Sequence, residues 1–387
     1  MREVFLIPPK EAECSKDTLW KLNKTVYGLN DAARSWYFTV RNCLIKLGCI
    51  QLKTDPAGFY WYDGDVLSGV IIMHVDDYFY GGTKTFEDVV VAGVKKEFQV
   101  GQQADGAFKY IGLEVKQHDD SIILSQNMYL KDVQPIAVSA GRATRKNEGC
   151  NAQEMKSLRS MVGQLGWLST HTRPDMRYEV LELSCIMSNP TVEHLIQANK
   201  CVKKMGMVEC NLRFPNLGDL QKVKLIALSD ASHANLPDGF SSAGGFIVFL
   251  VGENGKSCPL AWVAKKIKRV VKSTLAAEVH AASDAVDTCY YLGSMLSEML
   301  FGVQGKNVIP ITCYIDNYSL FENVQSTKSV NEKRLRIDLA ALKELVRDGM
   351  LTFKWVESCR QLSDCFTKRG VNTYTLIETL ERGILEI

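Results

Sequence analysis

Hydrophobic and polar positions divide the chain into blocks with different periodicities. Up to about residue 120, aromatic and β-branched runs at 58–62 and 69–75 predict strands, and Gly64 and Asp65 between them indicate a hairpin turn. In the second block, roughly 121–220, apolar residues recur at helical spacing over 155–168. The first block therefore favours β-hairpins, and the second is predicted to be mainly helical.

The third block, 221–387, begins with strands and continues with alternating helices and strands. The predicted strands are 223–228, 243–251, 260–264, 309–315 and 351–356, and the predicted helices are 274–300 and 333–347. Such an order favours a mixed five-stranded sheet flanked by helices. The fold class expected for the chain is α/β and α+β.

Four acids of the third block stand where a sheet edge would gather them. Asp230 and Asp316 directly follow apolar strands, Glu278 lies in the first turns of the long helix, and Asp364 follows the last strand. Carboxylates gathered in this way repel one another unless cations lie between them, and Mg²⁺ prefers oxygen ligands. Two ions ~3.5–4 Å apart can clamp the attacking and leaving oxygens of a phosphodiester. These acids are therefore predicted to be catalytic residues and ligands of two Mg²⁺ ions, or of Mn²⁺. The alternative is that each acid is simply a solvent-exposed residue at the end of a strand or the start of a helix.

Composition and charge narrow the class of protein. A length of 387 residues suggests two or three domains, and a net charge of +2 requires any nucleic-acid-binding surface to be local. The twelve cysteines form no C-x-x-C pair, which is typical of reduced thiols in an intracellular protein. Arg2 and Glu3 follow Met1, so no signal peptide is expected, and no apolar run is long enough to cross a bilayer. We expect a cytoplasmic or nuclear protein without a membrane role.

Four ordered motifs of the third block carry a family resemblance. They are LSDAS around Asp230, KSTLAAE ending at Glu278, YIDN around Asp316 and QLSDCFTK around Asp364. In this order they resemble the ribonuclease H segments of copia-type retrotransposon Pol polyproteins. The resemblance implies that 221–387 is an RNase H-like domain, which hydrolyses the RNA strand of RNA–DNA hybrids by two-metal catalysis. Retroviral ribonucleases H carry a histidine shortly before the last aspartate. This chain has no histidine at that place, and Arg360 is a candidate for the role.

The first block resembles the reverse transcriptase of the same family. Residues 26–37, which include Arg34, resemble the helix that contacts template, and His74-Val75-Asp76-Asp77 resembles the polymerase active-site hairpin. Residues 108–115 look like the primer grip. The resemblance implies a partial palm over 1–120 and a thumb and connection over 121–220.

Polymerase chemistry in this family needs a further aspartate on a strand that precedes residues 3–6. The chain begins at Met1, so we expect Asp76 and Asp77 to be a polymerase remnant and primer extension to be lost, unless another chain supplies the missing N-terminal region. The alternative for Asp76 and Asp77 is a plain hairpin turn.

Basic residues near these acids predict contacts with phosphates, which make binding depend on salt. The candidates are Lys265, Lys266, Lys268, Arg269 and Lys272 before Glu278, and Lys333, Arg334 and Arg336 at the start of the late helix. A solvated basic face is the alternative. The expected partner is an RNA–DNA hybrid or another nucleic acid, selected by shape and 2′-hydroxyl contacts. Tyr314, Trp262 and Trp355 are interpreted as core residues.

Two other functions stay open. One is a catalytically silent nucleic-acid-binding module, which would bind hybrids with a steep salt dependence but would not cut them. The other is a remnant that folds poorly, because loss of part of the palm exposes strand edges.

Overall fold

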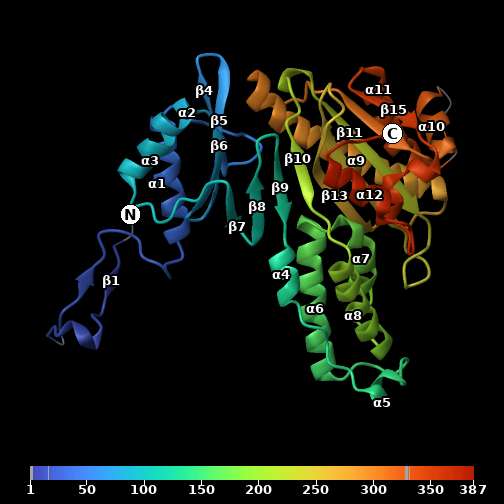
Figure 1. The fold of residues 1–387 in the computed structure, drawn as a ribbon, viewed down its shortest axis with the longest axis horizontal. Coiled ribbons are helices and arrows are strands. Elements are labelled where there is room, and N and C mark those ends of the chain that lie inside the picture. The colour runs from blue at the N-terminus through green and yellow to red at the C-terminus, as the bar shows by residue number, and fades with distance from the viewer. Residues whose placement is uncertain (1–2, 16, 327–329, 331) are drawn as a thin grey trace. The chain divides into compact units, whose positions relative to one another are not determined.

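The computed structural model describes residues 3–15, 17–326, 330 and 332–387, and the chain divides into two compact units. They are Met1–Gln102 and Gln103–Ile387. Their helices and strands are labelled in Figure 1. None of the described helices combines the length and the apolar composition that a bilayer span requires.

The first unit is built on an antiparallel sheet of order β3-β4-β5-β6. Its elements are β1 (Phe5–Leu6), β2 (Trp20–Lys21), α1 (Ala32–Lys46), β3 (Ile50–Gln51), β4 (Gly58–Asp63), β5 (Val66–His74), β6 (Asp77–Gly82), α2 (Lys84–Phe86), a π-helical segment (Glu87–Val91) and α3 (Ala92–Glu97). The predicted hairpin is confirmed, with Gly64 and Asp65 as the turn between β4 and β5. Phe59, Ile71 and Phe86 pack against Leu44 of α1 to form the core of this unit.

The second unit begins with an antiparallel sheet of order β10-β9-β8-β7 and a group of helices. These elements are β7 (Ala107–Tyr110), β8 (Leu113–Gln117), β9 (Ser121–Ser125), α4 (Asn127–Asp132), α5 (Ala140–Ala143), α6 (Ala152–His171), α7 (Arg177–Cys185), α8 (Val192–Met207) and β10 (Leu212–Pro215). The helix predicted over 155–168 is α6, and it begins earlier because Asn151 and Glu154 form a capping box. Leu158, Leu165 and Leu195 are among the buried residues that hold these helices together.

A mixed five-stranded sheet of order β13-β12-β11-β14-β15 follows, as predicted. Its strands are β11 (Lys224–Ser232), β12 (Ala243–Val251), β13 (Ser257–Lys266), β14 (Ile311–Ile315) and β15 (Leu351–Trp355). β11 is antiparallel to β12 and parallel to β14, which is parallel to β15. The parallel pairing of β11 and β14 brings the ends of both strands to one edge of the sheet.

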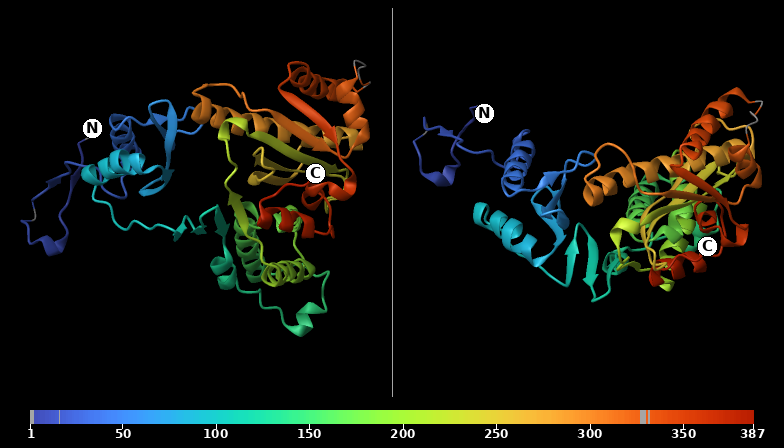
Figure 2. Two further views of the ribbon diagram at one scale, coloured as in Figure 1. Left: turned by 45° about the horizontal axis from the view of Figure 1, so that its top comes forward. Right: turned by 90° about the horizontal axis from the view of Figure 1, so that it is seen from above.

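Both faces of this sheet are buried. The flanking helices are α9 (Thr274–Phe301), α10 (Tyr318–Gln325), α11 (Lys333–Arg347) and α12 (Tyr374–Arg382). Leu225 and Ala227 of β11 pack on the core that contains α9, whereas Ile226 and Leu228 pack on the core that contains α12. Successive side chains of a strand point to opposite faces, so the continuous apolar run of β11 reflects burial on both. α9 lies against this sheet (Figure 2).

Candidate metal and nucleic-acid site

Three of the predicted acids meet at the edge of the five-stranded sheet. Asp230 lies near the end of β11, Asp316 directly follows β14, and Glu278 lies in the second turn of α9. One ligand oxygen from each acid lies within 4.8 Å of the others. Asp230 is 1% exposed and Glu278 is 3% exposed. The parallel register of β11 and β14, together with the packing of α9 on β11, therefore builds a compact and mostly buried group of carboxylates.

Burial sets the electrostatics of this group. Desolvation raises the pKa of Glu278 to about 9, and the charges of Asp230 and Asp316 act in the same direction. Desolvation also raises the pKa of Asp230 to about 6, with Lys368 opposing the shift. Glu278 Oε2 is buried and has no hydrogen-bond partner among the described residues. Since a buried acceptor without a partner is costly, and all the donors are oxygens, the residues fit a divalent cation such as Mg²⁺.

The structure places Asp364 beside this group rather than within it. Asp364 lies in a short 3-10 helix, Leu362–Phe366, and its Oδ1 accepts a hydrogen bond from Lys368 Nζ at 2.6 Å. The same Nζ lies 3.4 Å from Asp230 Oδ2, and the Thr367 hydroxyl donates to Asp230. Burial lowers the pKa of Lys368, but the negative charges of Asp230 and Asp364 outweigh it, so the pKa is raised. Lys368 therefore links Asp364 to the other acids as a fixed positive charge.

A glycine allows this segment to approach the sheet. Gly245 of β12 pairs with Asp230 across the ladder. A Cβ atom at Gly245 would lie 2.4 Å from Phe366 Cβ, which is closer than van der Waals contact permits. The absence of a side chain at Gly245 therefore lets Phe366 pack on β12, and this packing brings Thr367 and Lys368 to Asp230.

The surroundings of Asp316 correct one interpretation from the sequence. Ser358 Oγ donates to Asp316 Oδ2 at 2.7 Å, and Trp355 Nε1 donates to the Asp316 carbonyl oxygen at 3.0 Å. Trp355 is 44% exposed, so its interpretation as a core residue was wrong. β15 ends at Trp355, and this side chain is exposed at the end of the strand.

Arg360 does not contact the acids through any hydrogen bond or ion pair in the described residues. It is exposed and ends a short 3-10 helix, Ser358–Arg360. The cation that does reach the acids is Lys368, which the sequence reasoning missed. The four-residue spacing between Asp364 and Lys368 was the available signal, since oppositely charged side chains at this spacing often pair in helical segments.

The predicted basic residues fall into two groups. Lys265, Lys266 and Arg269 form ion pairs with Asp284, Asp238 and Asp338, at 2.7, 2.8 and 3.2 Å. The others are exposed and form no ion pair within the part of the chain that the structure describes, namely Lys268, Lys272, Lys333, Arg334 and Arg336.

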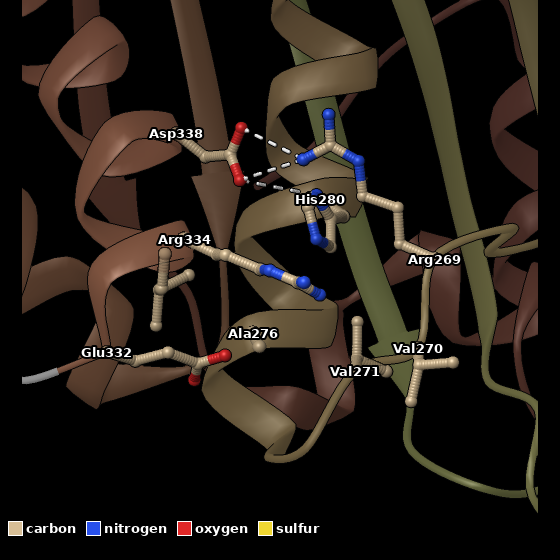
Figure 3. A pocket seen from close by; sticks show the side chains of 9 residues that line it. Arg269, Val270, Val271, Ala276, His280, Glu332, Arg334 and Asp338 are labelled. Carbon is tan, nitrogen blue, oxygen red and sulfur yellow. Dashed lines mark hydrogen bonds and ion pairs between the residues drawn. The ribbon is translucent and has the colours of Figure 1, made fainter.

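Two of these arginines share a pocket of about 310 Å³, which is shown in Figure 3. Arg269 and Arg334 both line it, and Asp338 lies close to both Arg269 and His280. Of the two arginines in this pocket, Arg269 is paired with Asp338, whereas Arg334 has no carboxylate partner among the described residues.

The first unit carries the predicted polymerase hairpin. Asp76 and Asp77 are exposed at the turn between β5 and β6. Val75 adopts a left-handed conformation with φ of 58°, which is strained for a β-branched residue, and Trp36 Nε1 donates to its carbonyl oxygen at 2.8 Å. Arg34 is exposed on α1, and its guanidinium lies over the Phe38 ring. Among the described residues, no further acid joins Asp76 and Asp77 in a group that could hold a metal ion.

Sequence comparisons match this chain to the family that the motifs resemble. The reverse transcriptase (RNA-dependent DNA polymerase) family model matches residues 1–141. The retrovirus-related Pol polyproteins from transposons RE1 and RE2 of Arabidopsis thaliana are each 27% identical to this chain, over 90% and 91% of its length. The chain spans 24% of the length of each of these relatives. A solved structure of LC11-RNase H1 in complex with RNA/DNA hybrid aligns with 37% of this chain and 94% of its own, at 15% identity and a TM-score of 0.29.

The two Pol polyproteins match across nearly the whole chain, so the matched region spans both the turn at Asp76 and Asp77 and the carboxylate group. The chain is therefore similar to copia-type retrotransposon Pol polyproteins over most of its length, and its residues 1–141 match the reverse transcriptase family model.

Proposed function

We propose that the chain hydrolyses the RNA strand of RNA–DNA hybrids at the carboxylate group of Asp230, Glu278 and Asp316. The observation that carries this proposal is the group itself: ligand oxygens within 4.8 Å of one another, with one buried oxygen that lacks a hydrogen-bond partner in the described residues. The four motifs around these acids and Asp364 support it. A domain division at 1–120, 121–220 and 221–387 is proposed on these motifs and on the resemblance of the first block to reverse transcriptase, with the nuclease in the last part.

Each residue of the site has a role in this proposal. Asp230, Glu278 and Asp316 would hold divalent cations, two of them in the full site, and Ser358 fixes the orientation of the Asp316 carboxylate. Mg²⁺ bound there would stabilise charge on the scissile phosphodiester and help to activate the attacking water. Lys368 keeps Asp364 next to the group and adds positive charge where the phosphodiester would approach.

The first test is a cleavage assay with a hybrid whose RNA and DNA strands carry different labels, in Mg²⁺ or in EDTA. We expect loss of the RNA strand alone, only with Mg²⁺, and a fall of at least about 100-fold for Asp316→Asn because a ligand is lost. Asp348→Asn is the matched control, since Asp348 is an exposed acid just after α11. Equal cleavage by all three proteins would exclude the site, and binding without cleavage would favour the silent binding module.

We also propose that this chain alone does not extend a primer. Asp76 and Asp77 have no third acid beside them in the described residues, and polymerase chemistry needs carboxylates that together hold two ions. Template-directed primer extension with Mg²⁺ and with Mn²⁺ tests the proposal. Incorporation that is lost in Asp76→Asn would refute it.

A further inference from the structure

A groove adjoins the carboxylate group on the side of α7. It has a volume of about 490 Å³, and its lining includes Tyr178 and Glu182 of α7, Ser232 and Asn235, and Lys368 and Arg369. Lys368 also bonds to Asp364 and Asp230. The groove is therefore continuous with the proposed nuclease site, and one of its walls comes from a helix that lies outside the five-stranded sheet.

Arg369 is held at this groove by one carboxylate. Its Nε donates to Glu182 Oε2 at 3.0 Å, and this pair joins residues 187 positions apart. The Arg369 side chain is 61% exposed, whereas that of Glu182 is 10% exposed. No described residue accepts a hydrogen bond from the two terminal nitrogens of Arg369. Glu182 thus orients the guanidinium through Nε and leaves the two terminal nitrogens of Arg369 available to a ligand.

Hydrogen bonds of Asn235 hold the wall beside Arg369 together. Asn235 Nδ2 donates to Tyr178 Oη at 2.9 Å and to the Thr367 carbonyl oxygen at 2.7 Å. Asn235 Oδ1 accepts from the Ala243 N–H at 3.1 Å. One side chain therefore ties α7, the segment that contains Thr367 and β12 together.

The chemistry of the lining favours a sugar-phosphate backbone over a base. Lys368 and Arg369 supply positive charge, and Ser232 supplies a hydroxyl group. Tyr178 is almost fully buried, so it offers no ring face for stacking. Arginine binds phosphate through two parallel N–H groups, and phosphate contacts set the register of a protein on a nucleic acid.

We propose that this groove binds the sugar-phosphate backbone next to the phosphodiester that is cut, with Arg369 as a phosphate ligand positioned by Glu182. This inference rests on the proposed nuclease function. It assigns part of the substrate-binding surface to α7, a helix of the segment that precedes the five-stranded sheet.

The test compares three substitutions in the full chain, with binding of a fluorescently labelled RNA–DNA hybrid measured in EDTA over a range of salt concentrations. Arg369→Gln should raise the Kd roughly 3- to 10-fold and reduce the salt slope by about 1, because one phosphate contact is lost. Glu182→Gln keeps an amide oxygen that can accept from Arg369 Nε and removes a negative charge from the groove, so it should bind at least as tightly as the parent. Arg382→Gln is the control, since Arg382 is also exposed and ion-paired but lies on α12; it should bind like the parent.

Two results would overturn the inference: unchanged binding by Arg369→Gln, or equal weakening by Glu182→Gln and Arg369→Gln, which a purely structural ion pair would produce. If Arg369→Gln folds poorly, the double variant with Glu182→Gln removes the buried unpaired carboxylate and should show the same weakening. Mg²⁺-dependent cleavage by the parent chain is measured in parallel. Its absence would refute the nuclease function, whereas the binding results in EDTA decide the role of Arg369 separately.

Discussion

The proton on buried Glu278 should make the stability of the metal-free protein fall as pH rises. The pKa of Glu278 is raised from 4.5 to about 9, chiefly by burial. Between these values the folded protein holds a proton that the unfolded chain has lost. The free energy of unfolding therefore decreases with pH in this window, and the loss is complete above the folded pKa. Glu278→Gln cannot ionise, so it should lack this dependence.

The size of the effect follows from one proton. One bound proton changes the free energy of unfolding by ~1.4 kcal/mol per pH unit, so the parent should lose ~2 kcal/mol relative to Glu278→Gln from about pH 7 to about pH 8.5. Asp230, whose pKa is raised to about 6, is already ionised in this range. The difference between the two proteins removes the contributions of other titrating groups, which both share.

Urea unfolding in EDTA, followed by tryptophan fluorescence at several pH values, measures this difference. Glu322→Gln is the control, because Glu322 is an exposed glutamate on α10 and its loss should leave the pH dependence of the parent intact. Saturating Mg²⁺ should weaken the dependence in the parent, since metal binding displaces the proton. Parallel pH dependences of the parent and Glu278→Gln in EDTA would show that Glu278 is ionised without metal, and the reasoning from burial would be wrong.

Three further predictions concern the surroundings of the site. Lys368→Met should tighten Mn²⁺ binding roughly 3- to 10-fold, measured by titration, because a positive charge next to Asp364 is removed; weaker or equal binding would contradict this. Gly245→Ala should destabilise the protein by about 1–3 kcal/mol in urea unfolding, because the new methyl group overlaps Phe366; an unchanged midpoint would show that the segment moves freely. Asp175→Asn should cost about 3–5 kcal/mol of stability, because it breaks the buried ion pair between Asp175 and Arg173, whose charged atoms lie 2.8 Å apart. A thermal melt like that of the parent would refute this prediction.

Local pattern in the sequence was enough to place several elements of the fold. The apolar runs that became β11 and β12, and the helical stripe that became α9, were identified because burial on one or both faces imposes a periodicity on consecutive residues. Short helices of the third block were missed, namely α10 and α12, because a few turns contain too few apolar positions for a clear period. Asp230, Glu278 and Asp316 were found because each stands near the end of a strand or the start of a helix.

Other features depend on contacts between distant residues, and only the tertiary structure decided them. Lys368 reaches Asp230 across 138 positions, and Arg369 reaches Glu182 across 187. The close approach of Gly245 to Phe366 likewise requires the packed sheet. No local periodicity records such pairs, because a side chain's partner is set by which segments pack together. The sequence by itself therefore determined which acids lie at the ends of elements, whereas packing decided which three of them meet, which cation joins them and how much their burial raises the pKa of Glu278.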